Sequence, residues 1–113
     1  MKENKLITLS IEFSIAVIEL CDTIKGHRSM VDQLERAATS IGANIHEANY
    51  AQSKADFVSK LQIALKECFE TEYWLRLFFE AHICDSDISA IQNKCGTIRK
   101  LLISSINTAK SNI

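Results

Sequence analysis

The segment VDQLERAATSIGANIHEA (31–48) decides the fold of this chain. Its apolar residues recur at alternating steps of three and four, which is the period of one side of an α-helix. They are Val31, Leu34, Ala38, Ile41, Ile45 and Ala48. Just upstream, Ser29 and Asp32 have the spacing of a capping box, and Gly26 is placed to end a preceding helix in a left-handed conformation. The segment therefore predicts an amphipathic helix over residues 30–49.

The same period predicts three more helices, over residues 4–25, 54–81 and 86–109. Ser53 and Asp56 repeat the capping signal before the second of these. The apolar sides comprise Leu6, Phe13, Val17, Leu20 and Ile24 in the first, Phe57, Leu61, Ala64, Cys68, Thr71, Leu75 and Phe78 in the next, and Ile88, Ile91, Cys95, Ile98, Leu102, Ser105 and Ala109 in the last. Short connections favour antiparallel neighbours. Residues 1–113 are therefore predicted to form one all-α domain, an antiparallel up-down-up-down four-helix bundle.

Composition agrees with a helical domain and indicates the cellular compartment in which it works. The 113 residues contain no proline and three glycines, and the net charge is -1. There is no secretion signal and no apolar run of the ~18 residues that a membrane span needs. Two of the four cysteines fall on the predicted apolar sides, which indicates reduced thiols packed as small hydrophobic groups. We therefore expect a cytoplasmic protein that does not enter a membrane.

The first helix is too apolar to be hidden in a small monomer. Besides its core side it carries a second apolar row, and the third helix has apolar residues away from its core side, Trp74 among them. Contiguous exposed apolar surface usually marks an interface. We therefore predict self-association, with an oligomer interface that contains Ile7, Ile11, Ile15, Ile18 and Trp74.

A polar row runs beside the core of the second helix, and two carboxylates lie on one side of the third. We predict one network that contains Arg36, Ser40, Asn44, Glu47, Glu67 and Glu70. Carboxylates flanked by apolar groups need hydrogen-bond donors when they are buried, and Arg36 supplies them. We interpret the network as a structural device that fixes helix register or subunit contacts. The alternative is a ligand or partner site between the helices.

Catalytic and metal-binding patterns are absent from the sequence. Di-iron bundles need Glu-x-x-His pairs, and none of His27, His46 and His82 has a Glu three residues before it. There is no G-x-S-x-G motif and no glycine-rich phosphate loop. Cysteines at core positions make poor nucleophiles. The sequence therefore predicts a protein that is not an enzyme and has no cofactor and no metal.

Two consecutive runs, LERAATSIGANIHEA (34–48) and SKADFVSKLQIALKECFETEYWLRL (53–77), resemble the 23S ribosomal RNA intervening-sequence protein family. The first matches the pattern L-x-R-A-A-x-S-I-x-x-N-I-x-E, and the second contains I-A-x-x-E-x-x-E-x-x-Y-W-L. One departure is Ala48, where family members commonly have glycine. The resemblance covers the two central helices strongly, and the outer two match in length and pattern.

The resemblance implies a small four-helix bundle assembled as a homopentamer around a central channel, with no catalytic residues. A related branch of the family comprises accessory proteins of diversity-generating retroelements, which bind RNA and a reverse transcriptase. We therefore expect a homo-oligomeric scaffold that binds RNA or a nucleic-acid enzyme through the basic last segment. The expected contacts are Lys94, Arg99, Lys100 and Lys110. The alternative is a protein-interaction or structural module without nucleic acid, because residues 31–85 have a negative charge balance.

Overall fold

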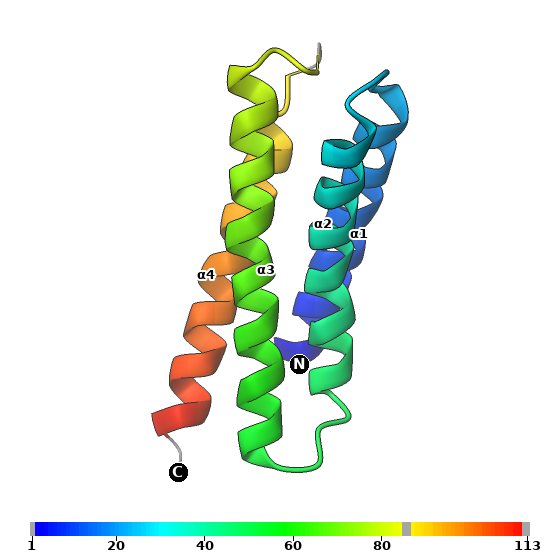
Figure 1. The fold of residues 1–113 in the computed structure, drawn as a ribbon. Helices are drawn as coiled ribbons and strands as arrows, with labels where there is room; N and C mark the ends of the chain where they lie inside the picture. The colour runs from blue at the N-terminus through cyan, green and yellow to red at the C-terminus, as the bar shows by residue number, and fades with distance from the viewer. Residues whose placement is uncertain (1, 85–86, 112–113) are drawn as a thin grey trace.

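The computed structural model describes residues 2–84 and 87–111, with side chains from residue 5 onward. Four helices make up most of this part of the chain: α1 (Lys2–Thr23), α2 (Arg28–Ala48), α3 (Lys54–Glu80) and α4 (Ser89–Ser111). In Figure 1 the chain rises through α1, descends through α2, rises through α3 and descends through α4. The described residues contain no strand, so the prediction of an all-α chain with four helices is confirmed.

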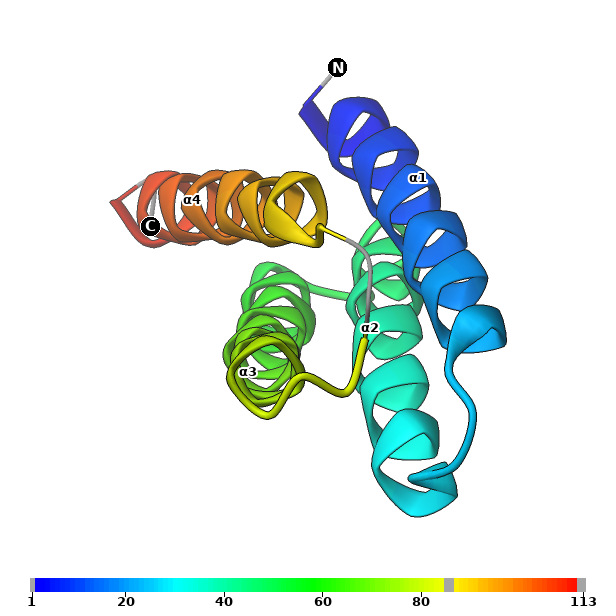
Figure 2. The same ribbon diagram turned by 90° about the horizontal axis from the view of Figure 1, so that it is seen from above.

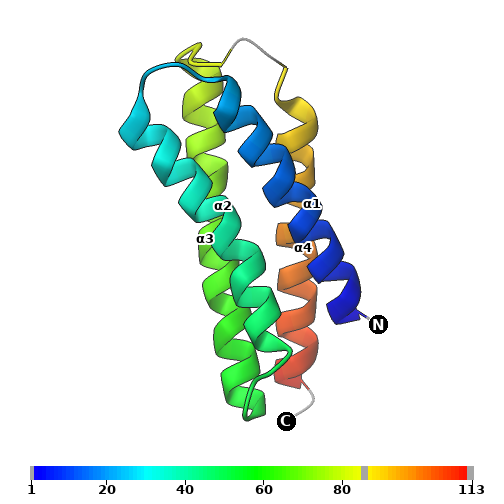
Figure 3. The same cartoon turned by 90° about the vertical axis from the view of Figure 1, so that its right-hand side faces the viewer.

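Each helix packs against two others. α1 and α3 both contact α2 and α4. Seen from above in Figure 2, α2 lies between α1 and α3. The view in Figure 3 shows the helices running along the long axis of a molecule that measures 47 × 21 × 19 Å. None of the helices in the described part of the chain has the length and hydropathy needed to cross a bilayer.

The two central helices begin and end within two residues of the predicted positions. Ser53 caps α3, since its Oγ accepts a hydrogen bond from the Asp56 N–H at 3.0 Å. Gly26 has the expected left-handed backbone, with a φ of 79°. The predicted capping box at Ser29 is wrong, because α2 begins at Arg28, two residues before the predicted start, and Ser29 lies inside the helix. Its N-cap is His27, which is itself left-handed with a φ of 53° and makes no side-chain cap.

Both ends of α1 lie two residues before the predicted positions, and the start of α4 departs further. α1 ends at Thr23, where the hydroxyl donates to the Leu20 carbonyl at 2.7 Å. α4 begins at Ser89 and not at 86. Asp85 and Ser86 lie outside the described residues, and residues 87–88 are not helical. The Asp87 carboxylate accepts a hydrogen bond from the Ser89 N–H at 2.9 Å, so the start of α4 is capped later than the sequence indicated.

The predicted apolar sides of the four helices meet in one core. Most of the predicted residues are buried, and the others lie half-buried at its edge; these are Ile24, Val31, Phe57, Ile91, Ser105 and Ala109. Sequence reasoning missed Ile106 and Cys21, which are 5% exposed. Both lie beside a predicted position on the same helix, so the core is wider there than a single row of residues.

α1 and α2 approach each other closely at Gly42. A Cβ atom placed on this glycine would lie 3.1 Å from Oγ and 3.3 Å from Cβ of Ser10. Ser10 was also missed as a core residue. It is 1% exposed, and its hydroxyl donates to the Ile7 carbonyl at 2.9 Å, so its polar atom is satisfied within α1. The small side chains at this crossing set the position of α1 on the rest of the bundle.

Candidate functional site

A cluster of four side chains connects α2 to α3. Nη1 of Arg36 lies 3.4 Å from Oε1 of Glu67, and Nη2 donates to Oε2 of Glu70 at 2.5 Å. The same Glu70 oxygen accepts a hydrogen bond from the Trp74 indole at 3.1 Å. We call these four residues the Arg36 cluster. It brings together three of the six residues predicted to form the polar network, and it adds Trp74.

Hydrogen bonding sets the charge state of the Arg36 cluster. The guanidinium of Arg36 and then the indole of Trp74 lower the pKa of Glu70, while the hydrogen bond that Arg36 donates to Glu70 raises the pKa of Arg36. Glu67 is the most enclosed of the three charged members, with 19% of its side chain exposed, against 38% for Glu70 and 45% for Arg36. The cluster is therefore a set of charged partners that hold one another, which suits fixing of helix register better than proton transfer.

The other three members of the predicted network lie apart from this cluster. The Asn44 side-chain amide donates to the Ser40 carbonyl at 2.8 Å, so this contact stays within α2. Glu47 pairs with Lys60 of α3 at 3.2 Å. The six predicted residues thus fall into three groups: one in the Arg36 cluster, one in the Glu47–Lys60 pair and one within α2. The spacing on each helix predicted a shared side, but it did not determine which residues meet between α2 and α3.

The second apolar row of α1 points away from the core. Ile11 is 54% exposed, Ile15 is 50% exposed and Ile18 is 39% exposed, while Ile7 is half-buried. We call these four residues the α1 isoleucine row. Successive members are three or four residues apart and form one contiguous strip. Trp74, assigned by sequence to the same interface, is half-buried on α3, and Ile63, about three helical turns before it on the same helix, is 40% exposed.

The four basic residues expected to contact nucleic acid all lie on α4. Nε of Arg99 pairs with Oε2 of Glu72 on α3 at 3.1 Å. Lys94 lines a pocket of about 220 Å³ between α1 and α4, with Leu9 and Glu12. Lys100 and Lys110 are exposed. The four cations thus point in several directions, and α4 contains no aspartate or glutamate.

Sequence reasoning missed a set of exposed aromatic side chains. Phe69 is 53% exposed and Tyr73 is 59% exposed, one turn apart on α3, and Tyr50 and Phe79 are also exposed. The signal was present in the third helix, where both Phe69 and Tyr73 lie off the core period.

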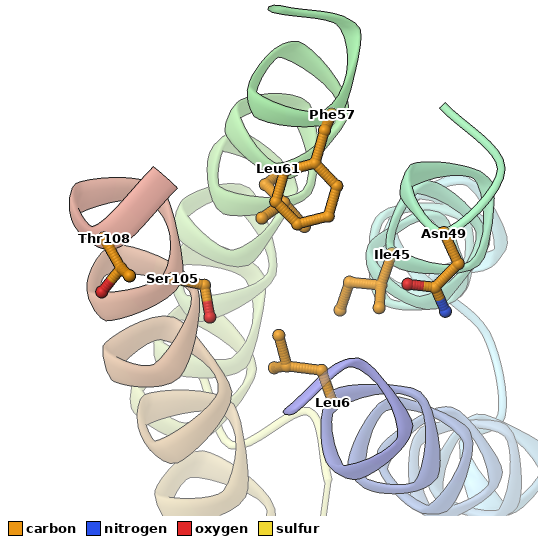
Figure 4. Close-up of a pocket in the computed structure, with 7 residues that line it drawn as sticks. All are labelled: Leu6, Ile45, Asn49, Phe57, Leu61, Ser105 and Thr108. Carbon is orange, nitrogen blue, oxygen red and sulfur yellow. The ribbon is translucent and has the colours of Figure 1, made fainter. Parts of the chain in front are cut away.

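The interior offers little room for a ligand. Figure 4 shows a pocket at the end of the bundle that holds the N-terminal part of α1, with side chains from all four helices pointing into it. Its volume is about 50 Å³, and it is lined by Leu6, Ile45, Asn49, Phe57, Leu61, Ser105 and Thr108. A space of this size suits a few water molecules. Among the described residues, no group of three or more His, Cys, Asp and Glu side chains is placed to hold a metal ion.

The four cysteines carry free thiols. Burial and nearby carboxylates raise the pKa of Cys21 to about 11. Cys68 and Cys95 are 0% exposed, and the Cys95 thiol donates to the Cys68 carbonyl at 3.8 Å. The hydrogen bond with Cys95 and burial raise the pKa of Cys68 as well. Neutral, enclosed thiols are poor nucleophiles, so Cys21 and Cys68 serve packing.

Comparisons with known proteins identify the family of the chain. The profile of the 23S rRNA-intervening sequence proteins matches residues 2–104. A crystal structure of a protein of unknown function from the S23 ribosomal protein family of Bacteroides thetaiotaomicron VPI-5482 has 44% sequence identity and a TM-score of 0.86, over 95% of this chain and 99% of that one. No curated protein sequence matches the chain. The resemblance inferred from residues 34–77 is confirmed, and the chain belongs to the 23S rRNA-intervening sequence protein family.

Proposed function

We propose that this protein is a non-enzymatic, homo-oligomeric scaffold in which antiparallel four-helix bundles associate through the α1 isoleucine row. The observation that carries the proposal is the exposure of Ile11, Ile15 and Ile18, which lie in one strip and are between 39% and 54% exposed. Burying a whole isoleucine side chain stabilises a complex by about 1.5–3 kcal/mol, so covering the exposed part of these three contributes about 2–4 kcal/mol. The family resemblance makes a pentamer the expected assembly.

Two features support a role without catalysis. The Glu70 carboxylate is held by the Arg36 guanidinium and the Trp74 indole, which lower its pKa and keep it ionised. The thiols of Cys21 and Cys68 are kept neutral by a raised pKa. Free thiols of this kind persist in a reducing environment, which supports the proposed cytoplasmic location.

Mass measurement of paired variants tests the assembly. Ile11→Ser combined with Ile15→Ser removes apolar surface from the middle of the row, and Ile103→Ser on α4 is the matched control, since Ile103 is 36% exposed. In native mass spectrometry we expect the wild type and the control at five times the 12.7 kDa chain mass, and the row variant at a smaller multiple with unchanged helical circular dichroism. A row variant that keeps the wild-type mass would remove the row from the interface.

RNA, alone or with a nucleic-acid enzyme, is the partner that we propose for the scaffold. The supporting observation is that α4 carries Lys94, Arg99, Lys100 and Lys110 and no carboxylate, while the chain as a whole has a net charge of -1. A homo-oligomer would present several copies of this helix, and repeated weak contacts combine into strong binding. Contacts between cations and phosphates release counterions, so the affinity should fall steeply as salt is raised.

The competing proposal is a protein-interaction module without nucleic acid. It is favoured by the negative charge balance of residues 31–85, which suits a basic protein partner. The two proposals separate when the protein is purified without nuclease and weighed intact. Bound mass that ribonuclease removes supports RNA. An affinity for RNA that is undetectable at low salt excludes RNA as the partner and leaves the protein partner.

A further inference from the structure

A second surface of the bundle, on the outer side of α3 and α4, combines aromatic rings with positive charge. On α3, Lys66, Phe69, Tyr73 and Arg76 follow one another at steps of three, four and three residues, which places them along one side of the helix. All four side chains are exposed. We call them the α3 outer row. It lies away from the core side of α3, which carries Leu61, Ala64, Cys68, Thr71, Leu75 and Phe78.

Ion pairs on either side of the row establish its orientation. Glu67 and Glu70 point towards α2, because both contact Arg36. Glu72 points towards α4, because it pairs with Arg99. Phe69 and Tyr73 therefore lie on the outward surface between these two contacts. Figure 2 shows this side of α3 facing away from α1 and α2.

α4 extends the same surface with further cations. Ile103 follows Arg99 by one helical turn and is 36% exposed, and Lys110 lies on the same side of α4 further along. Lys100, beside Arg99, is exposed at the outer edge. The carboxylates that border this surface are paired with arginines: Glu72 with Arg99, Glu80 with Arg76, and Glu70, which lies near Lys66, with Arg36. Lysines therefore give the surface a positive charge.

We propose that this surface binds single-stranded RNA, with bases stacked on Phe69 and Tyr73 and phosphates held by Lys66, Lys100 and Lys110. The proposal rests on the RNA partner proposed above and deepens it by naming the contact surface and the form of RNA. Exposed aromatic rings flanked by cations accept unpaired bases of any sequence, because every base has a flat π-face. A duplex hides those faces within its stack, so the rings distinguish single strands from duplexes.

Binding of a fluorescently labelled oligouridine, followed by anisotropy, tests the proposal on the full chain. Stacking contributes about 1–3 kcal/mol per base, so Phe69→Ala and Tyr73→Ala should each raise the Kd roughly 5- to 150-fold. Tyr73→Phe keeps the ring and should bind as the wild type does. The second control is Tyr50→Ala, which removes an exposed aromatic side chain just after the C-terminal end of α2, outside the α3 outer row. This variant should also leave the Kd unchanged. Native mass and thermal unfolding are measured for every variant.

The outcomes separate the stacking surface from RNA binding as such. Weak binding by Phe69→Ala and Tyr73→Ala, with normal mass and stability, supports the proposal. Unchanged binding by both, together with loss in Lys66→Gln or Lys100→Gln, overturns stacking but keeps an RNA partner. No oligouridine or duplex binding by the wild type removes the RNA partner itself. A change of oligomer mass in the Phe69 or Tyr73 variants overturns the proposal and makes this surface a subunit contact.

Discussion

Gly42→Ala tests whether the crossing of α1 and α2 is as tight as the structure shows. Replacing glycine by alanine inside a helix is worth about 1 kcal/mol of stability from helix propensity alone. The added methyl group would, however, lie 3.1 Å from Oγ and 3.3 Å from Cβ of Ser10. Overpacking of this kind costs about 1–3 kcal/mol. The overpacking cost therefore equals or exceeds the propensity gain, and we expect a net destabilisation of roughly 0–2 kcal/mol.

The side chain of Ser10 has little freedom to relieve this contact. It is 1% exposed, and turning its hydroxyl away would break the hydrogen bond to the Ile7 carbonyl. Removing the side chain with Ser10→Gly abolishes the clash. In that background Gly42→Ala should therefore become stabilising, by about 1 kcal/mol.

Urea unfolding at one fixed protein concentration measures the four members of this double-mutant cycle. A coupling energy of about 1–3 kcal/mol between the two sites is expected, well above the few tenths found for independent sites. If Gly42→Ala were equally stabilising in both backgrounds, α1 would move away from α2 at no cost. The reasoning from the close approach would then be refuted. The position of the α1 isoleucine row relative to α2 would also not be determined by this crossing.

Three further predictions concern the core, a helix end and the Arg36 cluster. Leu102→Ala should lower the free energy of unfolding in urea by about 2–5 kcal/mol, because Leu102 is 0% exposed. Ile103→Ala, at the neighbouring position, should change it by less than about 0.5 kcal/mol in a single copy of the chain, because Ile103 is 36% exposed. Ser53→Ala should cost about 1 kcal/mol through loss of the α3 cap, and Ser59→Ala in the same helix should cost little. Glu70→Gln should lower the free energy of unfolding by about 0.2–1 kcal/mol at neutral pH, since the Arg36–Glu70 ion pair that it removes is partly solvated. Because the folded-state pKa of Glu70 is lowered, the stability it contributes is present above its ordinary pKa of 4.5 and is lost as pH falls through the folded value, so wild type and variant should converge in acid.

How far the sequence predicts this molecule depends on whether a feature belongs to one helix or to two. Periodicity and capping are properties of one helix, and they gave the apolar sides and the Ser53 cap correctly. The start of α2 was missed because His27 adopts a left-handed backbone. This conformation is uncommon in residues other than glycine, so the sequence pattern does not indicate it. The pairing of Glu47 with Lys60 was missed for a different reason. It depends on the relative rotation and register of α2 and α3, which the period of either helix leaves open.

The arrangement around α2 bears on how copies would assemble. The α1 isoleucine row lies on α1, whereas Ile63 and Trp74 lie on α3, and α2 lies between these two helices in Figure 2. A two-fold dimer pairs one patch with itself and would leave the other apolar patch in water. A ring pairs one patch with the other around a rotation axis and covers both. The ring proposed above would therefore cover both the α1 isoleucine row and the α3 residues Ile63 and Trp74, whereas a two-fold dimer would cover one of the two. In such a ring the Arg36 cluster would hold Trp74 through the hydrogen bond that its indole donates to Glu70.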